Sequence, residues 1–131
     1  MKILIVDDEE EILNMLRQNL EMEGYGVKTT TSPSEALVLM KRELFNLVIL
    51  DIKTPGMSGV ELLQELKQIN PLSNIIMMTG YSSMANVVDC LGSGAVDYFV
   101  KPFGDIELII QALGQARDRV DRWRTAMGVN K

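Results

Sequence analysis

Four of the short apolar runs in this sequence end in side chains that can do chemistry. These side chains are Asp7 and Asp8 after the first run, Asp51 after the third, Thr79 after the fourth and Lys101 at the end of the fifth. Three carboxylates that are brought together repel each other, and one of them takes up a proton unless a cation joins them. Oxygen ligands without His or Cys favour a hard cation, and Mg²⁺ fits best because it is shared among carboxylates, water and phosphate oxygens.

The same residue types suit phosphoryl transfer. An Asp carboxylate in this setting can attack phosphorus and form an acyl phosphate. The ammonium group of Lys101 and the hydroxyl of Thr79 could then hold phosphoryl oxygens. Each residue also has a plainer interpretation, since Asp8 could cap a helix, Thr79 could lie in a turn and Lys101 could be a solvated cation. The joint placement of all of them at strand ends favours the functional interpretation.

The apolar runs that precede these residues are typical of buried strands. They are residues 3–6, 26–30, 47–50, 74–78 and 96–100. Between them, mostly apolar residues recur every three or four positions, which predicts amphipathic helices. The four stripes are Ile12, Met15, Leu16, Asn19 and Leu20; Ala36, Leu37, Met40 and Leu44; Val60, Leu63, Leu66 and Lys67; and Ile106, Ile109, Ile110, Leu113, Ala116 and Val120. Because several strands are apolar throughout, this alternation predicts an α/β fold in which helices cover both faces of a parallel sheet. In such a fold, ligands bind beyond the carboxyl ends of the strands.

Capping and turn residues mark the ends of these elements. The sequences SPSE at 32–35 and SGVE at 58–61 fit the start of a helix, and Gly24 fits the end of the first one. The run 26–30 leads into threonines and a turn, so we expect it to form an edge strand.

Length and composition exclude several classes of protein. The chain has 131 residues, of which 47% are hydrophobic, so it can form one domain with a substantial core. Its net charge of −5 argues against nucleic-acid binding through bulk positive charge, and no apolar run approaches the length of a membrane span. The absence of His excludes His triads and His metal sites. The single cysteine, Cys90, allows no internal disulfide, which favours a reducing compartment such as the cytoplasm.

The C-terminal residues differ from the rest of the chain in charge. Two aspartates there are outnumbered by the basic residues Arg117, Arg119, Arg122, Arg124 and Lys131. Such a segment is either a solvated helix end, whose cations suit the helix dipole, or a contact surface for another protein.

Taken together, the motifs resemble the receiver domain of bacterial two-component response regulators. The matching segments are ILIVDDEE at 3–10, LVILDIKTPGMSGVELL at 47–63, IIMMTGYSS at 75–83 and GAVDYFVKPF at 94–103. The resemblance covers nearly the whole chain, so we expect a receiver domain at 1–122 and a helix end or tail at 123–131. It implies a flavodoxin-like, doubly wound sheet of five parallel strands in the order 2-1-3-4-5.

The resemblance implies a role for each acidic residue at the strand ends. Asp51 is expected to be the phospho-acceptor. Mg²⁺ is expected to bind Asp8 and Asp51 directly, Asp7 through water, and the backbone carbonyl of Lys53.

The resemblance also implies which residues bind the phosphoryl group and which residues change position when it is present. Thr79 is expected to bind it through its hydroxyl, and Lys101 through its ammonium group. When Thr79 is drawn toward the new oxygens, the ring of Tyr98 is expected to move inward, so these two residues form the switch. Lys53 and Tyr81 are expected to border the phosphoryl group and tune its lifetime, with bulky Tyr81 shielding it from water.

The resemblance also implies partners. A sensor histidine kinase or a phosphotransfer protein is the expected phosphoryl donor. A downstream protein is expected to bind the face made by the fourth helix, the fifth strand and the fifth helix. A homodimer linked to phosphorylation is a further option, whereas we expect no nucleic acid and no membrane to bind this chain. We expect no enzyme activity beyond its own phosphorylation and slow dephosphorylation.

Two alternatives use the same residues differently. The chain could be the receiver fragment of a longer regulator with a DNA-binding or ATPase domain, and its Arg-rich end would then start a linker. It could also be an Asp-nucleophile phosphatase of the haloacid dehalogenase type. That family needs a second acid two positions after the nucleophile, where this chain has Lys53, and the chain leaves no room for a cap domain.

Overall fold

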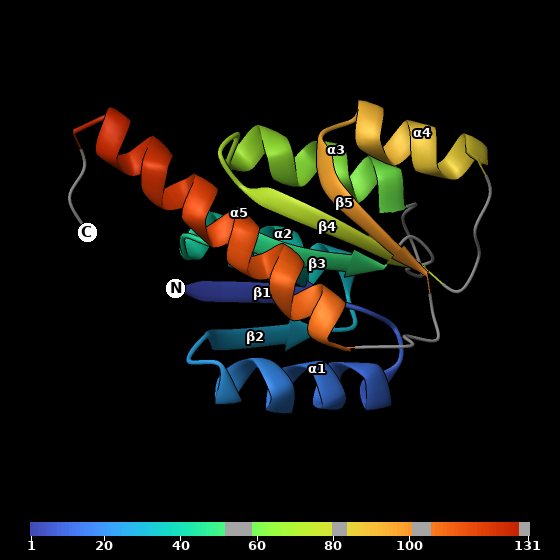
Figure 1. The fold of residues 1–131 in the computed structure, drawn as a ribbon. Helices are drawn as coiled ribbons and strands as arrows, with labels where there is room; N and C mark the ends of the chain where they lie inside the picture. The colour runs from blue at the N-terminus through green and yellow to red at the C-terminus, as the bar shows by residue number, and fades with distance from the viewer. Residues whose placement is uncertain (52–58, 80–83, 101–105, 129–131) are drawn as a thin grey trace.

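The structure, a computed structural model, describes residues 1–51, 59–79, 84–100 and 106–128, with the side chains of residues 79 and 84–86 outside this description. In these ranges five strands alternate with five helices (Figure 1). The strands are β1 (Lys2–Val6), β2 (Gly26–Thr30), β3 (Leu47–Asp51), β4 (Asn74–Thr79) and β5 (Ala95–Val100). The helices are α1 (Glu10–Met22), α2 (Pro33–Arg42), α3 (Gly59–Ile69), α4 (Met84–Gly92) and α5 (Ile106–Ala126).

The five strands form one parallel sheet in the order β2-β1-β3-β4-β5. This order confirms the one that the family resemblance implies, and β2 lies at an edge of the sheet as predicted. Because every strand runs in the same direction, all the carboxyl ends meet at one end of the sheet. Ligands bind at this end in open α/β folds.

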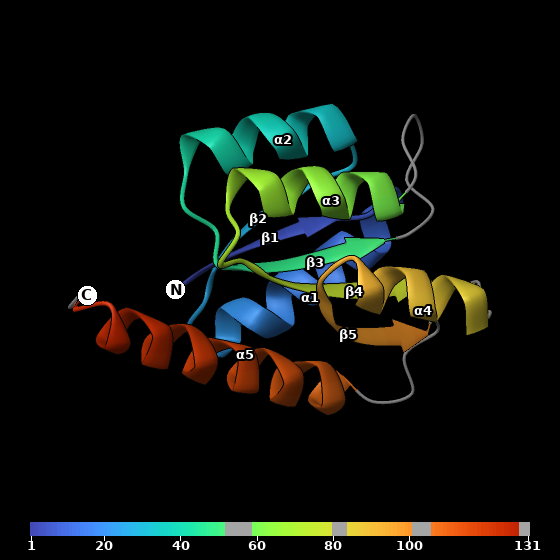
Figure 2. The ribbon, with the colours of Figure 1, turned by 90° about the horizontal axis from the view of Figure 1, so that it is seen from above.

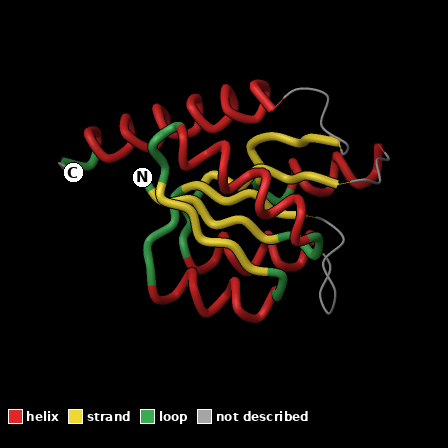
Figure 3. The backbone as a smooth tube through the Cα atoms, turned by 90° about the horizontal axis from the view of Figure 1, so that it is seen from below, coloured by secondary structure: helices red, strands yellow, loops and turns green. Residues whose placement is uncertain are grey.

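Alternating side chains along the strands build two hydrophobic cores, one on each face of the sheet. In β1, Ile3 and Ile5 pack in the cluster that includes α1 and α5, whereas Leu4 and Val6 pack in the cluster that includes α2, α3 and α4. Figures 2 and 3 show the sheet between these two layers of helices. The central strands are therefore covered on both faces, which explains why their sequences are apolar throughout.

Several helix ends lie where the capping residues predict them. The side chain of Ser32 accepts a hydrogen bond of 3.3 Å from the backbone N–H of Glu35, and Pro33 is the first residue of α2. Gly24 follows the end of α1 with a φ of +94°, a left-handed conformation that glycine adopts without steric cost. The second predicted cap, at Ser58, lies outside the described residues.

The buried side chains of the helices differ from the predicted stripes at several positions. Leu44 is 56% exposed because α2 ends at Arg42, and the chain then turns so that Phe45 fills the core instead. Leu13, Leu62 and Ala112 are buried although the predicted stripes omit them. The apolar face of a surface helix is wider than one line of side chains, so neighbouring positions on that face are also buried.

Helix α5 ends at Ala126, so residues 123–126 form the end of this helix. Its buried side runs from Ile109 to Val120, so its final turns extend past the hydrophobic core. Within the described ranges, none of the helices combines the length and the apolarity that crossing a bilayer requires.

Candidate functional site

The register of the central strands brings two acidic residues from distant parts of the sequence together. Val6 pairs with Leu50 in the parallel ladder between β1 and β3. Asp7, the next residue after β1, therefore lies beside Asp51, the last residue of β3. The adjacency of these two residues results from the strand order, because β1 and β3 are neighbours in the sheet.

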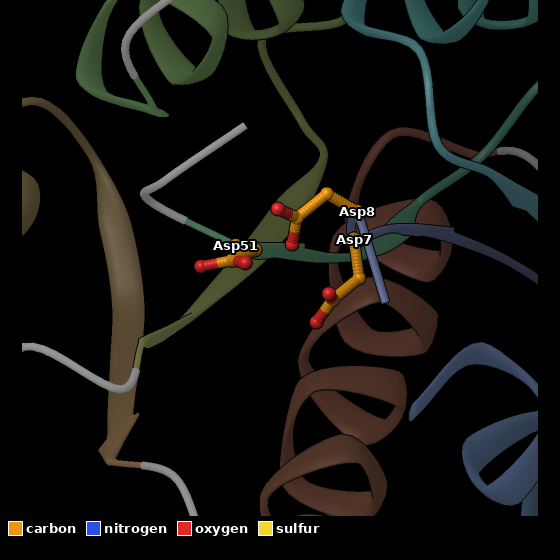
Figure 4. A group of neighbouring side chains, drawn as sticks. All are labelled: Asp7, Asp8 and Asp51. Atoms are coloured by element: carbon orange, nitrogen blue, oxygen red, sulfur yellow. The ribbon is translucent and has the colours of Figure 1, made fainter. Parts of the chain in front are cut away.

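Three carboxylate groups gather at this point. Asp7, Asp8 and Asp51 each offer one carboxylate oxygen, and these three oxygens all lie within 4.8 Å of one another. Figure 4 shows the three side chains side by side at the ends of β1 and β3. The exposed fraction is 0% for Asp7 and 3% for Asp51, whereas Asp8 is exposed. We call these three residues the acidic cluster.

Local hydrogen bonds hold Asp7 in this position. Its backbone N–H donates to the carbonyl oxygen of Thr30 at 3.2 Å, and its Oδ1 accepts from the N–H of Glu9 at 2.9 Å. Glu9 is the N-cap residue of α1, and it makes no side-chain capping bond. The plainer interpretation of Asp8 as the cap of this helix is therefore wrong, which leaves its exposed carboxylate available to a ligand.

The chemistry of the acidic cluster fits a metal ion. Carboxylate oxygens are hard ligands, and a divalent cation among three of them removes the mutual repulsion that their proximity creates. The described residues contain no second group of three acidic or Cys side chains as close together. The cluster also joins residues that the sequence analysis places at the carboxyl ends of strands, where this fold binds ligands.

Tyr98 lies on β5, close enough to the acidic cluster to sense its charge. The side chain is half-buried and packs against the core formed with α2, α3 and α4. Burial raises the pKa of the Tyr98 phenol above its ordinary value, and the titrating groups of Cys90 and Asp51 contribute in the same direction to a smaller extent.

Cys90 has the environment of a structural cysteine. Its thiol is free and buried. Burial raises the pKa of this thiol, and the charge of Asp89 adds to the effect. A raised pKa reduces the fraction of reactive thiolate.

The other predicted site residues are only partly within the described structure. The backbone of Thr79 ends β4, where it pairs with Val100 of β5. Its side chain, and the whole of Lys53, Tyr81 and Lys101, lie outside the described residues.

Comparisons with known proteins point to one family. The sequence profile of the response regulator receiver domain matches residues 3–113. The alginate biosynthesis transcriptional regulatory protein AlgB from Pseudomonas aeruginosa is 36% identical over 118 residues, which cover 90% of this chain and 26% of that protein. The chain thus spans about a quarter of the length of the first curated relatives that it matches.

Solved structures agree with this result. A CheY-like response regulator receiver domain protein from Methanospirillum hungatei JF-1 is 39% identical, with a TM-score of 0.85 and coverage of 92% of this chain and 96% of that one. A response regulator from Burkholderia pseudomallei, solved with a phosphorylated aspartic acid, a calcium ion and citrate, is 31% identical. Its TM-score is 0.81, and the match covers 95% of this chain and 74% of that one. The profile match, the strand order and these relatives together show that the chain belongs to the response regulator receiver domain family.

Proposed function

We propose that this chain accepts a phosphoryl group on Asp51 and uses it to switch a protein-binding face. The observation that supports the proposal most directly is the acidic cluster, in which an almost fully buried carboxylate lies within 4.8 Å of two others at the ligand-binding end of the sheet. The related Burkholderia pseudomallei protein, solved with a phosphorylated aspartic acid and a calcium ion, supports the same assignment.

In this proposal Asp51, the last residue of the central strand β3, is the nucleophile. Asp7 and Asp8, which follow the neighbouring strand β1, are the metal ligands beside it. An oxygen of Asp51 attacks the phosphorus atom and forms a new P–O bond. The bond between phosphorus and the donor breaks, and its electron pair remains with the donor's leaving group.

Mg²⁺ is the proposed cofactor. Asp8 and Asp51 would hold it directly, Asp7 through water, and Lys53 through its backbone carbonyl. When bound, the ion supplies positive charge that offsets the repulsion between the carboxylates and the incoming phosphoryl oxygens. In the proposal Lys101 adds a second positive charge at these oxygens, and the hydroxyl of Thr79 donates a hydrogen bond to them.

The phosphoryl group then biases the switch formed by Thr79 and Tyr98. Phosphorylation adds negative charge and acceptor oxygens, which draw the Thr79 hydroxyl toward Asp51. This movement leaves space for the ring of Tyr98 to turn inward. The proposed readout is the face made by α4, β5 and α5, to which a downstream protein binds.

The proposed partners follow from this cycle. A sensor histidine kinase or a phosphotransfer protein supplies the phosphoryl group in the cytoplasm, and a phosphorylation-linked homodimer is a second form of readout. In this proposal residues 1–122 are the receiver domain, the chain binds neither nucleic acid nor membrane, and it catalyses no reaction on other molecules. Membership of the receiver family gives the haloacid dehalogenase alternative no support.

The test uses a small-molecule donor, acetyl phosphate, with Mg²⁺. Intact-mass spectrometry should show the addition of one phosphoryl group to the native chain and none to Asp51→Ala. The matched control is Asp89→Ala, which removes an exposed aspartate of α4 and should be phosphorylated like the native chain. Chelation of the metal should reduce the signal. Equal phosphorylation of Asp51→Ala and Asp89→Ala would refute the assignment.

A further inference from the structure

At the end of the molecule opposite to the acidic cluster, the last turns of α5 overhang the beginnings of the strands. Figures 1 and 2 show this end of α5 reaching past the starts of β1, β3 and β4. A recess of about 190 Å³ lies beneath it, and its apolar lining includes Leu44, Leu72, Trp123 and Met127. The receiver chemistry proposed above uses none of these residues.

A second recess, of about 370 Å³, adjoins the first, and basic side chains outnumber acidic ones in its lining. Arg117, Asp121 and Arg124 line it from α5, and Lys2 lines it from β1. The two recesses share Leu44, Asn46 and Arg124, so they form one groove with an apolar part and a charged part. We call it the docking groove and define it by Leu44, Leu72, Arg117, Trp123, Arg124 and Met127.

The spacing of residues along α5 explains the two parts of the groove. Val120, Trp123 and Met127 recur at helical intervals and form one stripe, and an adjacent stripe carries Arg117 and Arg124. The apolar side chains are not covered by the protein, because Leu44 is 56%, Leu72 41% and Met127 54% exposed. Exposed apolar residues that cluster with Trp and Arg mark binding surfaces, since both residue types are enriched at the centres of protein interfaces.

Charge selects the kind of partner. The chain as a whole carries a net charge of −5, but the last turns of α5 are basic. Lys2 is already paired with Glu43 at 3.0 Å, and Arg117 lies 3.7 Å from Asp118 in an exposed ion pair. Arg122 and Arg124 make no ion pair with any residue that the structure describes. A partner that brings carboxylates is therefore attracted to this end, and a basic partner is repelled.

Two observations favour a protein segment over a small molecule. The groove is open, with its apolar side chains about half exposed, whereas small-molecule sites enclose most of the ligand surface. Within the described part of the chain, Oδ1 of Asp121 is buried at the edge of the groove and has no hydrogen-bond partner. A buried acceptor of this kind is costly to leave unpaired, and a peptide can supply the missing donor with a backbone N–H.

We propose that the docking groove binds an acidic segment of a partner protein. The segment places one large apolar side chain among Leu44, Trp123 and Met127, and its carboxylates lie against Arg117 and Arg124. Because this site is at the opposite end of the sheet from Asp51, docking is compatible with phosphorylation.

The test begins with a displayed library of short random peptides, selected on the full chain. The enriched peptides should combine several acidic residues with at least one large apolar residue. Trp123 is the only tryptophan of the chain, so its fluorescence reports occupancy of the groove directly when a selected, tryptophan-free peptide is titrated. Emission should shift on binding, and the shift should weaken as the salt concentration rises.

Matched variants locate the binding site. Leu44→Ser and Arg124→Glu should each weaken binding by about tenfold or more, as expected for central interface residues. The controls are Leu108→Ser, which removes a leucine with a similar exposure of 53%, and Arg42→Glu, which reverses a charge in the last turn of α2. Both controls should change affinity by less than about twofold, in line with substitutions outside an interface.

Four outcomes would overturn the proposal. They are a selection that enriches no acidic peptides, equal affinities of Leu44→Ser and Leu108→Ser, binding of anionic lipid vesicles in preference to the peptide, and a dimer of the chain that Leu44→Ser dissociates. Asp51→Ala should bind the peptide like the native chain, and Leu44→Ser should still be phosphorylated by acetyl phosphate. The docking proposal and the phosphorylation proposal can therefore fail separately.

Discussion

Asp7 and Asp8 are adjacent in the sequence but differ in environment. Asp7 is fully buried and holds the start of α1 through its bond with the N–H of Glu9, so its replacement would disturb the backbone as well as the acidic cluster. Asp8 is exposed, and it is not the cap of α1. Asp8 therefore offers the cleaner test of metal binding.

Asp8→Asn should raise the melting temperature in the absence of Mg²⁺ and reduce the stabilisation that Mg²⁺ provides. Without metal, removing one of three neighbouring negative charges should raise the melting temperature by about 2–4 °C. With Mg²⁺, the native chain should gain stability because the ion binds only the folded state, and the variant should gain much less. Thermal melts with and without Mg²⁺ measure both effects, with Asp89→Asn as the matched control. A variant that Mg²⁺ stabilises as strongly as the native chain would exclude Asp8 as a ligand.

Tyr81 is predicted to control the lifetime of the acyl phosphate. If the ring shields the phosphoryl group from water, Tyr81→Ala should lose the group several times faster than the native chain. Tyr81→Phe keeps the ring and removes only the hydroxyl, so its rate should stay close to the native rate. The decay of phosphorylated protein after removal of acetyl phosphate gives these rates. An unchanged or slower decay in Tyr81→Ala would contradict shielding.

Among the secondary-structure elements, the turn after α1 and the turn after α3 are stabilised in different ways. After α1, Gly24 takes a left-handed conformation and lets the chain turn into β2. After α3, Lys67 donates from its Nζ to the carbonyl oxygens of Pro71 at 2.8 Å and Ser73 at 2.9 Å. These bonds explain why a lysine continues the apolar stripe of α3, and partial burial lowers the pKa of its ammonium group.

Gly24→Ala and Gly92→Ala should change stability in opposite directions. A Cβ atom would meet nothing within 4 Å at either position, but only Gly24 has a positive φ, of +94°. Gly24→Ala should therefore lose about 1–2 kcal/mol of the free energy of unfolding. Gly92 is the last residue of α4, and Gly92→Ala should gain up to about 1 kcal/mol because alanine loses less entropy in a helix. Denaturant titrations measure both values, and equal changes would refute the conformational explanation.

At the scale of the whole molecule, the sheet connects the acidic cluster with the surface proposed as the readout. Asp51 ends β3 and Tyr98 lies on β5, with β4 between them. The charge of Asp51 nevertheless contributes to the raised pKa of the Tyr98 phenol. A change of charge at the proposed phosphorylation site is therefore expected to change the pKa of Tyr98, two strands away.

Asp51→Asn should lower the pKa of Tyr98 toward its ordinary value without removing the larger effect of burial. Tyrosine-selective NMR of the ring carbons during a pH titration measures this change. Tyr25 is the internal control, because its raised pKa results from burial and from charges that do not include Asp51. A raised pKa means that the contribution of Tyr98 to folding stability is present below the unfolded-state pKa, near 10.0, and is lost as the pH rises through the folded-state value. An unshifted Tyr98 in Asp51→Asn would show that the two sites are not coupled.

The alternation of strands and helices and the identity of the acidic residues at the strand ends could be predicted from the sequence alone. These features are local, because they follow from apolar periodicity and from capping residues such as Ser32 and Gly24. The strand order came from resemblance to a family and was confirmed by the pairing of β1 with both β2 and β3. The end of α2 was missed, because an apolar stripe continues to Leu44 while the chain has already left the helix.

Which residues share a site, and which of them are buried, depends on the packing of the folded chain. The contrast between buried Asp7 and exposed Asp8 depends on how the loop after β1 packs, and the approach of Asp51 depends on strand register. The docking groove likewise joins the start of the sheet to the last turns of α5, which are distant in the sequence. Contacts of this kind are set by packing between remote segments, so local residue patterns do not encode them individually.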